Sequence, residues 1–444
     1  MTDDIRAKVR ELMPALRSDL EDLIRIQSVS ADPERLGEVE KSAVAVRDLF
    51  AAEGFDSRIV RTEDGAPPAV IAHKLVEGAT TTVLLYAHHD VQPENDHADW
   101  DSPPWEPTER NGRLYARGSA DDKAGIVAHL AAIRALGDDL AVNVTMFIEG
   151  EEEVGSDTLP ELLHLHRDEL AADVIVIADS GNWDIGVPAL TTSLRGLVRI
   201  DAEVRTLTHG VHSGMWGGLV PDSLMTLSRL IASLHDDEGN VAVEGLFAGP
   251  AADVEYPEDR LRAESGAVPG IRWIGSGSTV ERLWTKPALS IIGLDAPKVA
   301  GSSNTLVPKA SARISMRIAP GDTVANARAC LEKHLQQHLP WGAELTMTLV
   351  DTGEPTRIDA TGPAFDTARS AFQEAWNGVA PIDMGVGGSI PFIAEFLNAY
   401  PDASVLVTGV EDPDTRAHGA NEGLHLAEFE NVCVAETLLL RNLA

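Results

Sequence analysis

Residues 83–90 read Val83-Leu84-Leu85-Tyr86-Ala87-His88-His89-Asp90, an apolar run that leads directly into two histidines and an aspartate. A similar run over residues 142–153 ends in Glu-Gly-Glu-Glu-Glu, and a third over residues 174–179 ends in an aspartate. A fourth run, residues 405–407, is followed after a loop by His418. Short runs rich in Val and Ile are typical of strands buried on both faces of a sheet.

The ionisable residues therefore follow the ends of predicted strands. In an open parallel sheet, ligands bind beyond the carboxyl ends of the strands, so residues distant in sequence are expected to converge at one edge. Two histidines and several carboxylates in one place favour a hydrolytic metal centre. Asp121-Asp122, at the start of a predicted helix over residues 121–136, lies between these strands in sequence.

The charge balance excludes several classes of partner. The 444 residues include 36 basic and 70 acidic side chains, a net charge of −34 that repels nucleic acid and anionic membranes. No apolar stretch approaches the ~18 residues that span a bilayer, and the first residues lack the layout of a signal peptide. The two cysteines, Cys330 and Cys433, exclude a disulfide framework and a cysteine-based zinc site. We expect a cytoplasmic protein without nucleic-acid or membrane partners.

The chain is expected to form an α/β domain interrupted by a smaller insertion. Predicted strands and helices alternate from about residue 55 to residue 190, and the pattern changes near Thr191. The predicted catalytic domain covers residues 1–191 and 356–444, with a mixed central sheet flanked by helices. The predicted insertion, residues 192–355, is an α+β domain with helices packed on one face of a mainly antiparallel sheet.

His88 and Asp90 stand two residues apart at the end of a predicted strand. A neutral imidazole is a good ligand for zinc or manganese. A carboxylate two residues on lies on the same side of an extended chain and could fix the tautomer of the histidine. The alternative is a loop pair without a special role. His89 would point the opposite way and is expected to be structural.

Asp121 and Asp122 could cap the predicted helix, or one of them could bridge two cations because both of its oxygens are free. Lys123 beside them is expected to be solvated or ion-paired. Glu151-Glu152-Glu153 directly follows a buried strand, where adjacent acids repel one another unless cations lie nearby. One acid can bind a metal while its neighbour acts as general base, and a solvated acidic loop is the alternative.

Other chemistries have less support. The sequence contains no Gly-x-Ser-x-Gly elbow and no His-Glu-x-x-His helix. Residues 385–389 are glycine-rich but lack the Gly-Lys-Ser/Thr ending of a phosphate-binding loop, so a tight turn that brings backbone close to a ligand is expected there.

Several separated motifs make the sequence similar to the M20 family of metallopeptidases, which includes carnosinase-like dipeptidases, aminoacylases, desuccinylases and glutamate carboxypeptidases. The resemblance spans nearly the whole chain and is closest to the carnosinase-like branch. The motifs are Tyr86-Ala87-His88-His89-Asp90, Arg117-Gly118-Ser119-Ala120-Asp121-Asp122-Lys123, Glu149-Gly150-Glu151-Glu152-Glu153-Val154-Gly155-Ser156, Asp179-Ser180-Gly181-Asn182-Trp183, Val211-His212-Ser213-Gly214, Gly387-Gly388-Ser389-Ile390-Pro391 and Ala417-His418-Gly419-Ala420-Asn421-Glu422.

The resemblance implies two divalent metal ions per subunit, with Zn²⁺ first and Mn²⁺ or Co²⁺ as alternatives. Asp121 would bridge the two ions. His88 and Asp179 would complete the ligand set of one ion, and Glu153 and His418 that of the other.

The catalytic roles also follow from the resemblance. Asp90 would orient His88, and Glu152 would be the general base on a metal-bridging water and later the proton donor to the leaving amine. Alignment of the acidic run on its flanking Glu-Gly and Gly-Ser leaves Glu151 outside this pair.

The resemblance makes the insertion a lid and dimerisation domain of a homodimer. His212 would reach the active site of the other subunit and polarise the scissile carbonyl. Arg317 would hold a substrate carboxylate with its bidentate guanidinium, and Thr305 and Ser389 would line the substrate site.

The expected activity is two-metal hydrolysis of dipeptides or other short peptide amides. The nearest alternative is an N-acyl amino acid amidohydrolase of the aminoacylase or desuccinylase type, which would use the same centre. A metal-binding dimer scaffold without catalysis is the alternative from another class.

Overall fold

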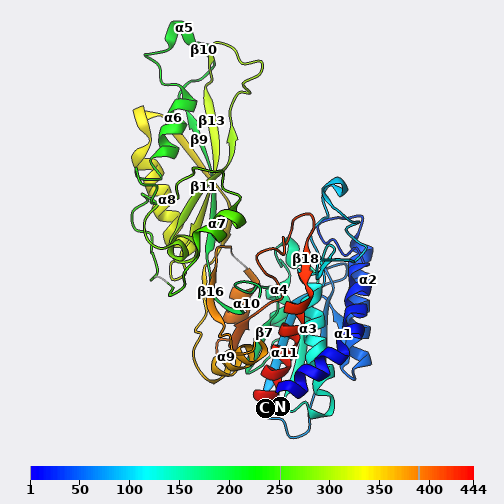
Figure 1. The fold of residues 1–444 in the computed structure, drawn as a ribbon. Coiled ribbons are helices and arrows are strands. Elements are labelled where there is room, and N and C mark those ends of the chain that lie inside the picture. The colour runs from blue at the N-terminus through cyan, green and yellow to red at the C-terminus, as the bar shows by residue number, and fades with distance from the viewer. Residues whose placement is uncertain (1, 251, 389–390) are drawn as a thin grey trace. The chain divides into compact units, whose positions relative to one another are not determined.

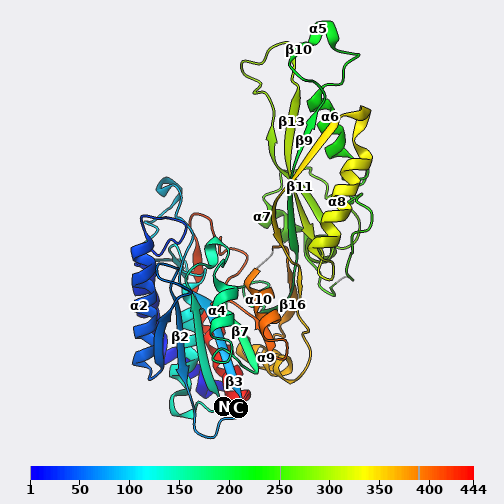
Figure 2. The same cartoon turned by 180° about the vertical axis from the view of Figure 1, so that it is seen from behind.

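The computed structural model describes residues 2–250, 252–388 and 391–444. Figures 1 and 2 show the chain from opposite sides, and they place the N- and C-termini next to each other. Among the described helices, none combines the length and the apolar character needed to cross a membrane.

The chain divides into two compact units. Unit 1 contains Met1–Thr192, Ile358–Met384 and Pro391–Ala444, and unit 2 contains Ser193–Arg357 and Gly385–Ile390. The glycine-rich turn after residue 384 is therefore grouped with the insertion rather than with the second part of the predicted catalytic domain. The backbone N–H of Arg195 donates to Val386 O at 3.1 Å, which ties this turn to unit 2.

A mixed sheet forms the centre of unit 1. Its strands, in spatial order, are β1 (Asp56–Val60), β2 (Ala69–Lys74), β6 (Asn143–Glu149), β3 (Thr82–His88), β7 (Val174–Ile177), β17 (Ser404–Val407) and β8 (Ala189–Leu194), and β8 also pairs with β15 (Thr356–Arg357) and β16 (Ile382–Val386).

The four apolar runs of the sequence are the parallel strands of this sheet. β6, β3, β7 and β17 pair in parallel, and the register aligns His88 with Glu149 and Tyr86 with Ile177. Their apolar residues are buried, as expected for strands covered on both faces. The carboxyl ends of these strands therefore meet at one edge, where the predicted ligands follow.

Helices cover both faces of the unit 1 sheet. α1, α3 and α11 form one layer, which is in front in Figure 1, and α4 and α10 lie on the opposite side, which Figure 2 shows. α2 packs against β1 and β2, and α9 packs against α11. The bounds are α1 (Thr2–Ile24), α2 (Leu36–Ala52), α3 (Lys123–Leu136), α4 (Leu159–Leu165), α9 (Pro363–Ala375), α10 (Pro391–Ala399) and α11 (Leu426–Asn442).

A small antiparallel sheet in unit 1 joins two segments that later carry site residues. It consists of β4 (Thr108–Arg110), β5 (Arg113–Tyr115) and β18 (Gly423–His425). Gly423 pairs with Tyr115, so the chain just before Asp121 is hydrogen-bonded to the chain just after His418.

Unit 2 is an antiparallel sheet with helices on one face. The sheet order is β11 (Ala288–Asp295), β13 (Lys309–Ile318), β9 (Gly196–Arg205) and β14 (Glu344–Gly353), and the covering helices are α6 (Ser223–Ala232) and α8 (Val324–His338). Along β9, alternate residues from Val198 to Val204 are buried against leucines of α6 and α8, including Leu230 and Leu331. This period of two gives the insertion a core of its own. The α/β class with an α+β insertion is confirmed.

Unit 2 also contains shorter strands and helices. They are β10 (Val211–His212), α5 (Ser213–Trp216), α7 (Glu258–Ser265) and β12 (Thr305–Leu306).

Candidate metal centre

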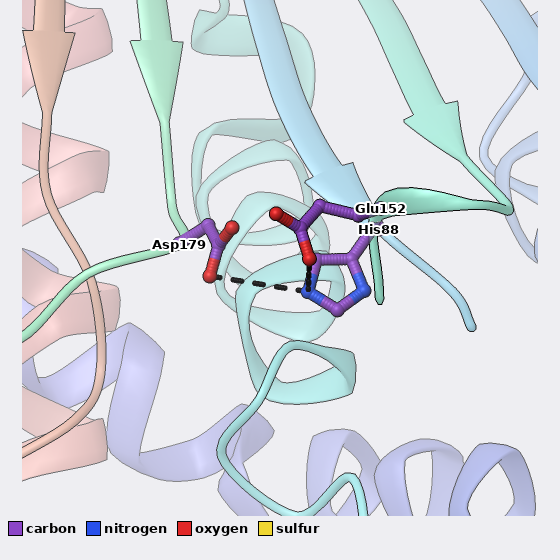
Figure 3. A group of neighbouring side chains, drawn as sticks. All are labelled: His88, Glu152 and Asp179. Atoms are coloured by element: carbon purple, nitrogen blue, oxygen red, sulfur yellow. Dashed lines mark ion pairs between the residues drawn. The ribbon is translucent and has the colours of Figure 1, made fainter. Parts of the chain in front are cut away.

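The predicted ligands of unit 1 converge at the carboxyl edge of the parallel strands. His88 is the last residue of β3, and Asp179 follows the end of β7 by two residues. Glu152 and Glu153 lie in a single 3₁₀ turn, Glu152–Val154, which begins three residues after the end of β6. Figure 3 shows the side chains of His88, Glu152 and Asp179 pointing toward one another from these three strand ends.

Asp121 lies between the two histidines. His88 Nε2 is 3.1 Å from Asp121 Oδ1, and His418 Nε2 is 3.1 Å from Asp121 Oδ2. The two carboxylate oxygens thus face different imidazoles. Glu153 Oε2 lies 3.3 Å from His418 Nε2 on the second side. This is the arrangement that a bridging carboxylate requires.

On the first side, His88 Nε2 lies 3.9 Å from Asp179 Oδ1 and 4.0 Å from Glu152 Oε2. His88, Glu152 and Asp179 form one group whose ligand atoms all lie within 4.8 Å, and His88, Asp121 and Glu153 form another. Two ligand atoms that each bind one zinc ion tetrahedrally at ordinary bond lengths lie about 3.4 Å apart. The spacing and the nitrogen and carboxylate donors therefore fit a pair of divalent cations.

The tautomer of His88 is fixed by its own loop. Its Nδ1 lies 3.0 Å from the backbone oxygen of Asp90 and 3.4 Å from Asp90 Oδ1. Because an N–H at Nδ1 donates to that carbonyl, the neutral ring has its lone pair at Nε2, where a cation could bind in place of a proton.

The carboxylate of Asp90 has a second function in this loop. Its two oxygens accept hydrogen bonds from the backbone N–H groups of Glu152 and Glu153, each at 3.2 Å. Asp90 therefore connects the histidine loop to the acidic turn as well as lying beside His88.

The acids of the centre disfavour one another's ionisation. Burial, followed by the charge of Asp179, raises the pKa of Glu152 well above its usual value. Burial also raises the pKa of Asp179 to about 7, and burial and the charge of Asp121 raise the pKa of Glu153. Carboxylates that lie close together away from water are stabilised by nearby positive charge, which protons or cations can supply.

The histidines supply part of this positive charge. Burial opposes protonation of His88, but hydrogen bonds with Asp121 and Asp90 outweigh it and raise the pKa well above its usual value. Hydrogen bonds with Asp121 and then Glu153 raise the pKa of His418 to about 11. Burial favours the protonated form of Asp121, but hydrogen bonds with His418 and His88 outweigh it and lower the pKa. Bound cations would take over the role of these protons.

Residues that were expected to lie outside the centre do so. The carboxylate of Glu151 accepts a hydrogen bond from the backbone N–H of Thr158 at 2.6 Å. His89 is fully buried with Nε2 3.0 Å from Pro68 O, and burial lowers its pKa to about 4. A Cβ at Gly150 would lie 2.4 Å from that same carbonyl oxygen, which explains why glycine occupies the start of the acidic turn.

The helix after Asp121-Asp122 begins at Lys123, and the side chain of Asp122 does not cap it. Asp122 Oδ2 instead accepts a hydrogen bond from the backbone N–H of His88 at 3.2 Å. The expectation that Lys123 is solvated or ion-paired is wrong. Its Nζ is buried and donates to Leu23 O at 2.8 Å and Ile26 O at 2.7 Å, and burial lowers its pKa to about 7.

The remaining predicted residues belong to unit 2. His212 and Thr305 are cross-strand neighbours in the β10–β12 pair, and both are exposed. The half-buried Arg317 lies on β13 opposite Leu197. Ser389 lies outside the described residues.

Three residues near these sites had no assigned role in the sequence analysis. Burial and the charges of Asp121 and Asp179 raise the pKa of Glu411 well above its usual value, so its carboxylate belongs to the acidic cluster. Its position four residues after the run 405–407 was an available signal. Glu422 and Arg117 form a buried ion pair. In the sequence, the one indication of a role for them was that each belongs to a motif shared with the M20 family.

A model of peptidase family M20/M25/M40 matches residues 84–442 of the chain. The chain belongs to this family. It is an enzyme, a metallopeptidase of the M20 type, and the resemblance inferred from its motifs is confirmed.

Individual relatives cover almost the whole chain. A cysteinylglycine-S-conjugate dipeptidase of Corynebacterium striatum is 33% identical over 430 residues, which are 95% of this chain and 94% of the relative. A β-Ala-His dipeptidase of Rattus norvegicus is 29% identical over 432 residues, covering 93% and 85% of the two chains. The solved structure of the dipeptidase Dug1p of Saccharomyces cerevisiae matches with a TM-score of 0.81 and 25% identity, covering 100% of this chain and 98% of that one.

The pKa shifts predict how pH affects the metal-free protein. The raised pKa of Asp179 favours folding at low pH, and this contribution is lost as pH rises from about 4 to about 7. The contribution of His418 is complete below about pH 6.5 and is lost as pH rises toward about 11. The melting temperature of the metal-free protein should therefore fall between about pH 5 and pH 8, and added Zn²⁺ should stabilise it more at pH 8 because the ligands must lose protons.

Differential scanning calorimetry with and without Zn²⁺ would test this. Asp179→Asn removes one titrating group and should make the fall in melting temperature shallower. The prediction would be contradicted if the melting temperature of the metal-free protein rose from pH 5 to pH 8. It would also be contradicted if Zn²⁺ raised the melting temperature equally at the two pH values.

Proposed function

We propose that this enzyme is a homodimeric dipeptidase that hydrolyses dipeptides or other short peptides with two divalent metal ions per subunit. The observation that carries the proposal is Asp121, whose two oxygens each lie 3.1 Å from a different histidine, with Glu152 beside them. The names of the dipeptidase relatives support the choice of substrate. A cytoplasmic setting, expected from the low cysteine count, is part of the proposal.

Two cations held by His88, Asp121, Asp179, Glu153 and His418 would supply Lewis acidity, which lowers the pKa of water and polarises a carbonyl. Zn²⁺ is our first choice, and Mn²⁺ or Co²⁺ suit the same donors. Glu152 would take a proton from the attacking water and later give it to the departing amine. Its pKa, raised by burial and by Asp179, suits a group that must both accept and return a proton.

Unit 2 carries a cation suited to the carboxylate of a peptide. Among the described residues, the guanidinium of Arg317 has no hydrogen-bond or ion-pair partner, so it is free to bind an anion. Arg195 is buried, and its guanidinium contacts the carbonyl oxygens of Gly387 and Arg282 at 3.2 and 3.3 Å. Burial and the charge of Arg317 lower the pKa of Arg195 to about 10. Two positive charges near each other favour a negatively charged substrate group. Ser389 would line the substrate site, and Thr305, the cross-strand neighbour of His212, would line it from the opposite subunit.

His212 would act on the active site of another subunit. Its Nδ1 accepts a hydrogen bond from the backbone N–H of Gly214 at 3.0 Å, which leaves Nε2 as the protonated, donating nitrogen of the neutral ring. The segment that follows exposes apolar side chains, with Met215 at 75%, Trp216 at 47% and Leu219 at 81% exposure. Large apolar groups gathered on one exposed segment are typical of a contact surface. Unit 2 would then be the lid and dimerisation domain, with His212 stabilising the oxyanion in the opposite subunit.

The runner-up function is that of an N-acyl amino acid amidohydrolase, which would use the same centre and the same Arg317 contact. The two functions differ in whether the substrate has a free α-amino group. The scaffold alternative is not retained, because the chain is an enzyme.

Glu152→Gln should retain metal and lose nearly all turnover, by a factor of ~10²–10⁴, because the amide cannot accept the proton of water. Metal content by mass spectrometry and initial rates on a dipeptide would be measured together. Glu151→Gln is the matched control, since Glu151 contacts Thr158 and should leave the rate near that of the wild type. Undiminished hydrolysis by Glu152→Gln would remove Glu152 from the mechanism.

An unmodified dipeptide should be hydrolysed at least ~10-fold faster than its N-acetyl form, because a site that binds an ammonium group rejects an analogue lacking it. Acids such as Glu411, whose pKa is raised by burial and by the charges of Asp121 and Asp179, favour a positively charged amino group on the substrate. Chromatographic separation of the products gives both rates in one metal-supplemented preparation. Faster hydrolysis of the N-acetyl form would select the amidohydrolase instead.

Mixed dimers should reveal whether His212 acts across subunits. Each homodimer of His212→Ala or Glu152→Gln should be nearly inactive. When equal amounts of the two variants exchange subunits to equilibrium, half of the C₂ dimers contain one subunit of each variant. Each such mixed dimer would have one intact site out of two, so the mixture should regain about a quarter of the wild-type rate. Activity of the mixture no greater than the mean of the two homodimers would place His212 outside the opposite subunit's site.

A further inference from the structure

Arg117 and Glu422 form an ion pair in the interior of unit 1. Arg117 Nη1 donates to Glu422 Oε2 at 2.6 Å, and the exposure of the two residues is 1% and 0%. Neither side chain belongs to the proposed ligand set. A buried ion pair adds little net stability compared with apolar residues of the same size. Stability alone therefore does not explain this pair, and its other hydrogen bonds show which segments it connects.

Every acceptor position of Glu422 is used within the chain. Its Oε2 also accepts a hydrogen bond from the backbone N–H of Gly118 at 3.0 Å. Its Oε1 accepts from the backbone N–H groups of Ala120 at 2.9 Å and Asp121 at 3.2 Å. A carboxylate has about four lone-pair positions, and four donors fill them here. Glu422 is therefore not a metal ligand, but it holds the peptide groups that lead to the bridging carboxylate.

Arg117 connects the same point to two other loops. Its Nη2 donates to Gly419 O at 3.0 Å, directly after His418, and to Pro93 O at 3.2 Å, in the chain after Asp90. The backbone N–H of Ala116 donates to Glu422 O at 3.1 Å, which closes the connection between the segments. The pair thus joins the loops that carry Asp121, His418 and His88.

We propose that Glu422, paired with Arg117, is a positioning residue that holds the loops of Asp121 and His418 in their metal-binding arrangement. This inference rests on the ligand set in the proposed function. Groups that orient ligands from behind contribute to metal affinity, and their loss weakens it by ~10–100-fold. The preformed hydrogen bonds reduce the ordering that must accompany metal binding.

Glu422→Gln tests the proposal. The side-chain amide keeps one oxygen but replaces the other with a donor, which would face Arg117 or a backbone N–H. The metal-stripped variant should bind Zn²⁺ ~10–100-fold more weakly than wild type in competition with a chromophoric chelator. This affinity is measured without substrate and does not depend on turnover.

Asp412→Asn is the matched control. Asp412 is buried and pairs with Arg113 through Oδ2 at 2.9 Å and Oδ1 at 2.5 Å, so it is another arginine–carboxylate pair of unit 1. Its carboxylate has no contact with the backbone of Asp121 or of its neighbours in the described structure. This variant should lose stability in urea unfolding but keep the zinc affinity of the wild type.

The outcomes separate this proposal from the underlying function. Zinc affinity of Glu422→Gln equal to that of wild type would overturn the positioning role, as would an equal loss in Asp412→Asn. If Glu422→Gln does not fold, Arg117→Lys decides, because lysine keeps the charge but loses the guanidinium fork: weaker zinc binding supports the proposal and unchanged binding overturns it. Absence of zinc binding by the wild type would refute the metal centre itself.

Discussion

Repulsion among carboxylates at the carboxyl edge of the parallel strands is the constraint on which unit 1 depends. Burial and mutual charge raise the pKa values of Glu152, Glu153 and Asp179. Ionisation of these acids is therefore less favourable in the folded chain than in water. Two histidines on opposite sides of Asp121 provide only part of the missing positive charge. The same unfavourable electrostatics of the metal-free chain would favour the binding of cations.

Such a centre needs a rigid support, and the strands provide it. β3, β6 and β7 each pair with neighbouring strands and are buried. The residues just after their carboxyl ends therefore start from a fixed backbone position and have little conformational freedom. Loops then complete the set: the carboxylate of Asp90 holds the turn of Glu152 and Glu153 by two backbone N–H groups. The precision of the centre thus comes from strand ends and from polar contacts between loops, in that order.

The sequence predicts the positions of the strand-end side chains well because these positions depend on a simple rule. An apolar run that ends in an acid or a histidine places that residue at the edge of the sheet, as His88 and Asp179 show. His418 lies eleven residues after Val407, so its arrival beside Asp121 depends on loop contacts that no periodicity reveals. Lys123 was misjudged for a related reason: its partners are the carbonyl oxygens of Leu23 and Ile26, and a carbonyl leaves no mark in the sequence.

The two units also differ in the charge of their proposed functional groups. Unit 1 gathers acids, which suit cations and an ammonium group, whereas Arg317 and Arg195 of unit 2 are cations suited to a carboxylate. In the proposed function, the two ends of a dipeptide carry these opposite charges. Unit 2 has its own core between its sheet and α6 and α8, so its surface can change without disturbing the unit 1 strands that carry the proposed metal ligands. In the proposed function, the metal site is therefore more strongly constrained by this fold than the choice of substrate.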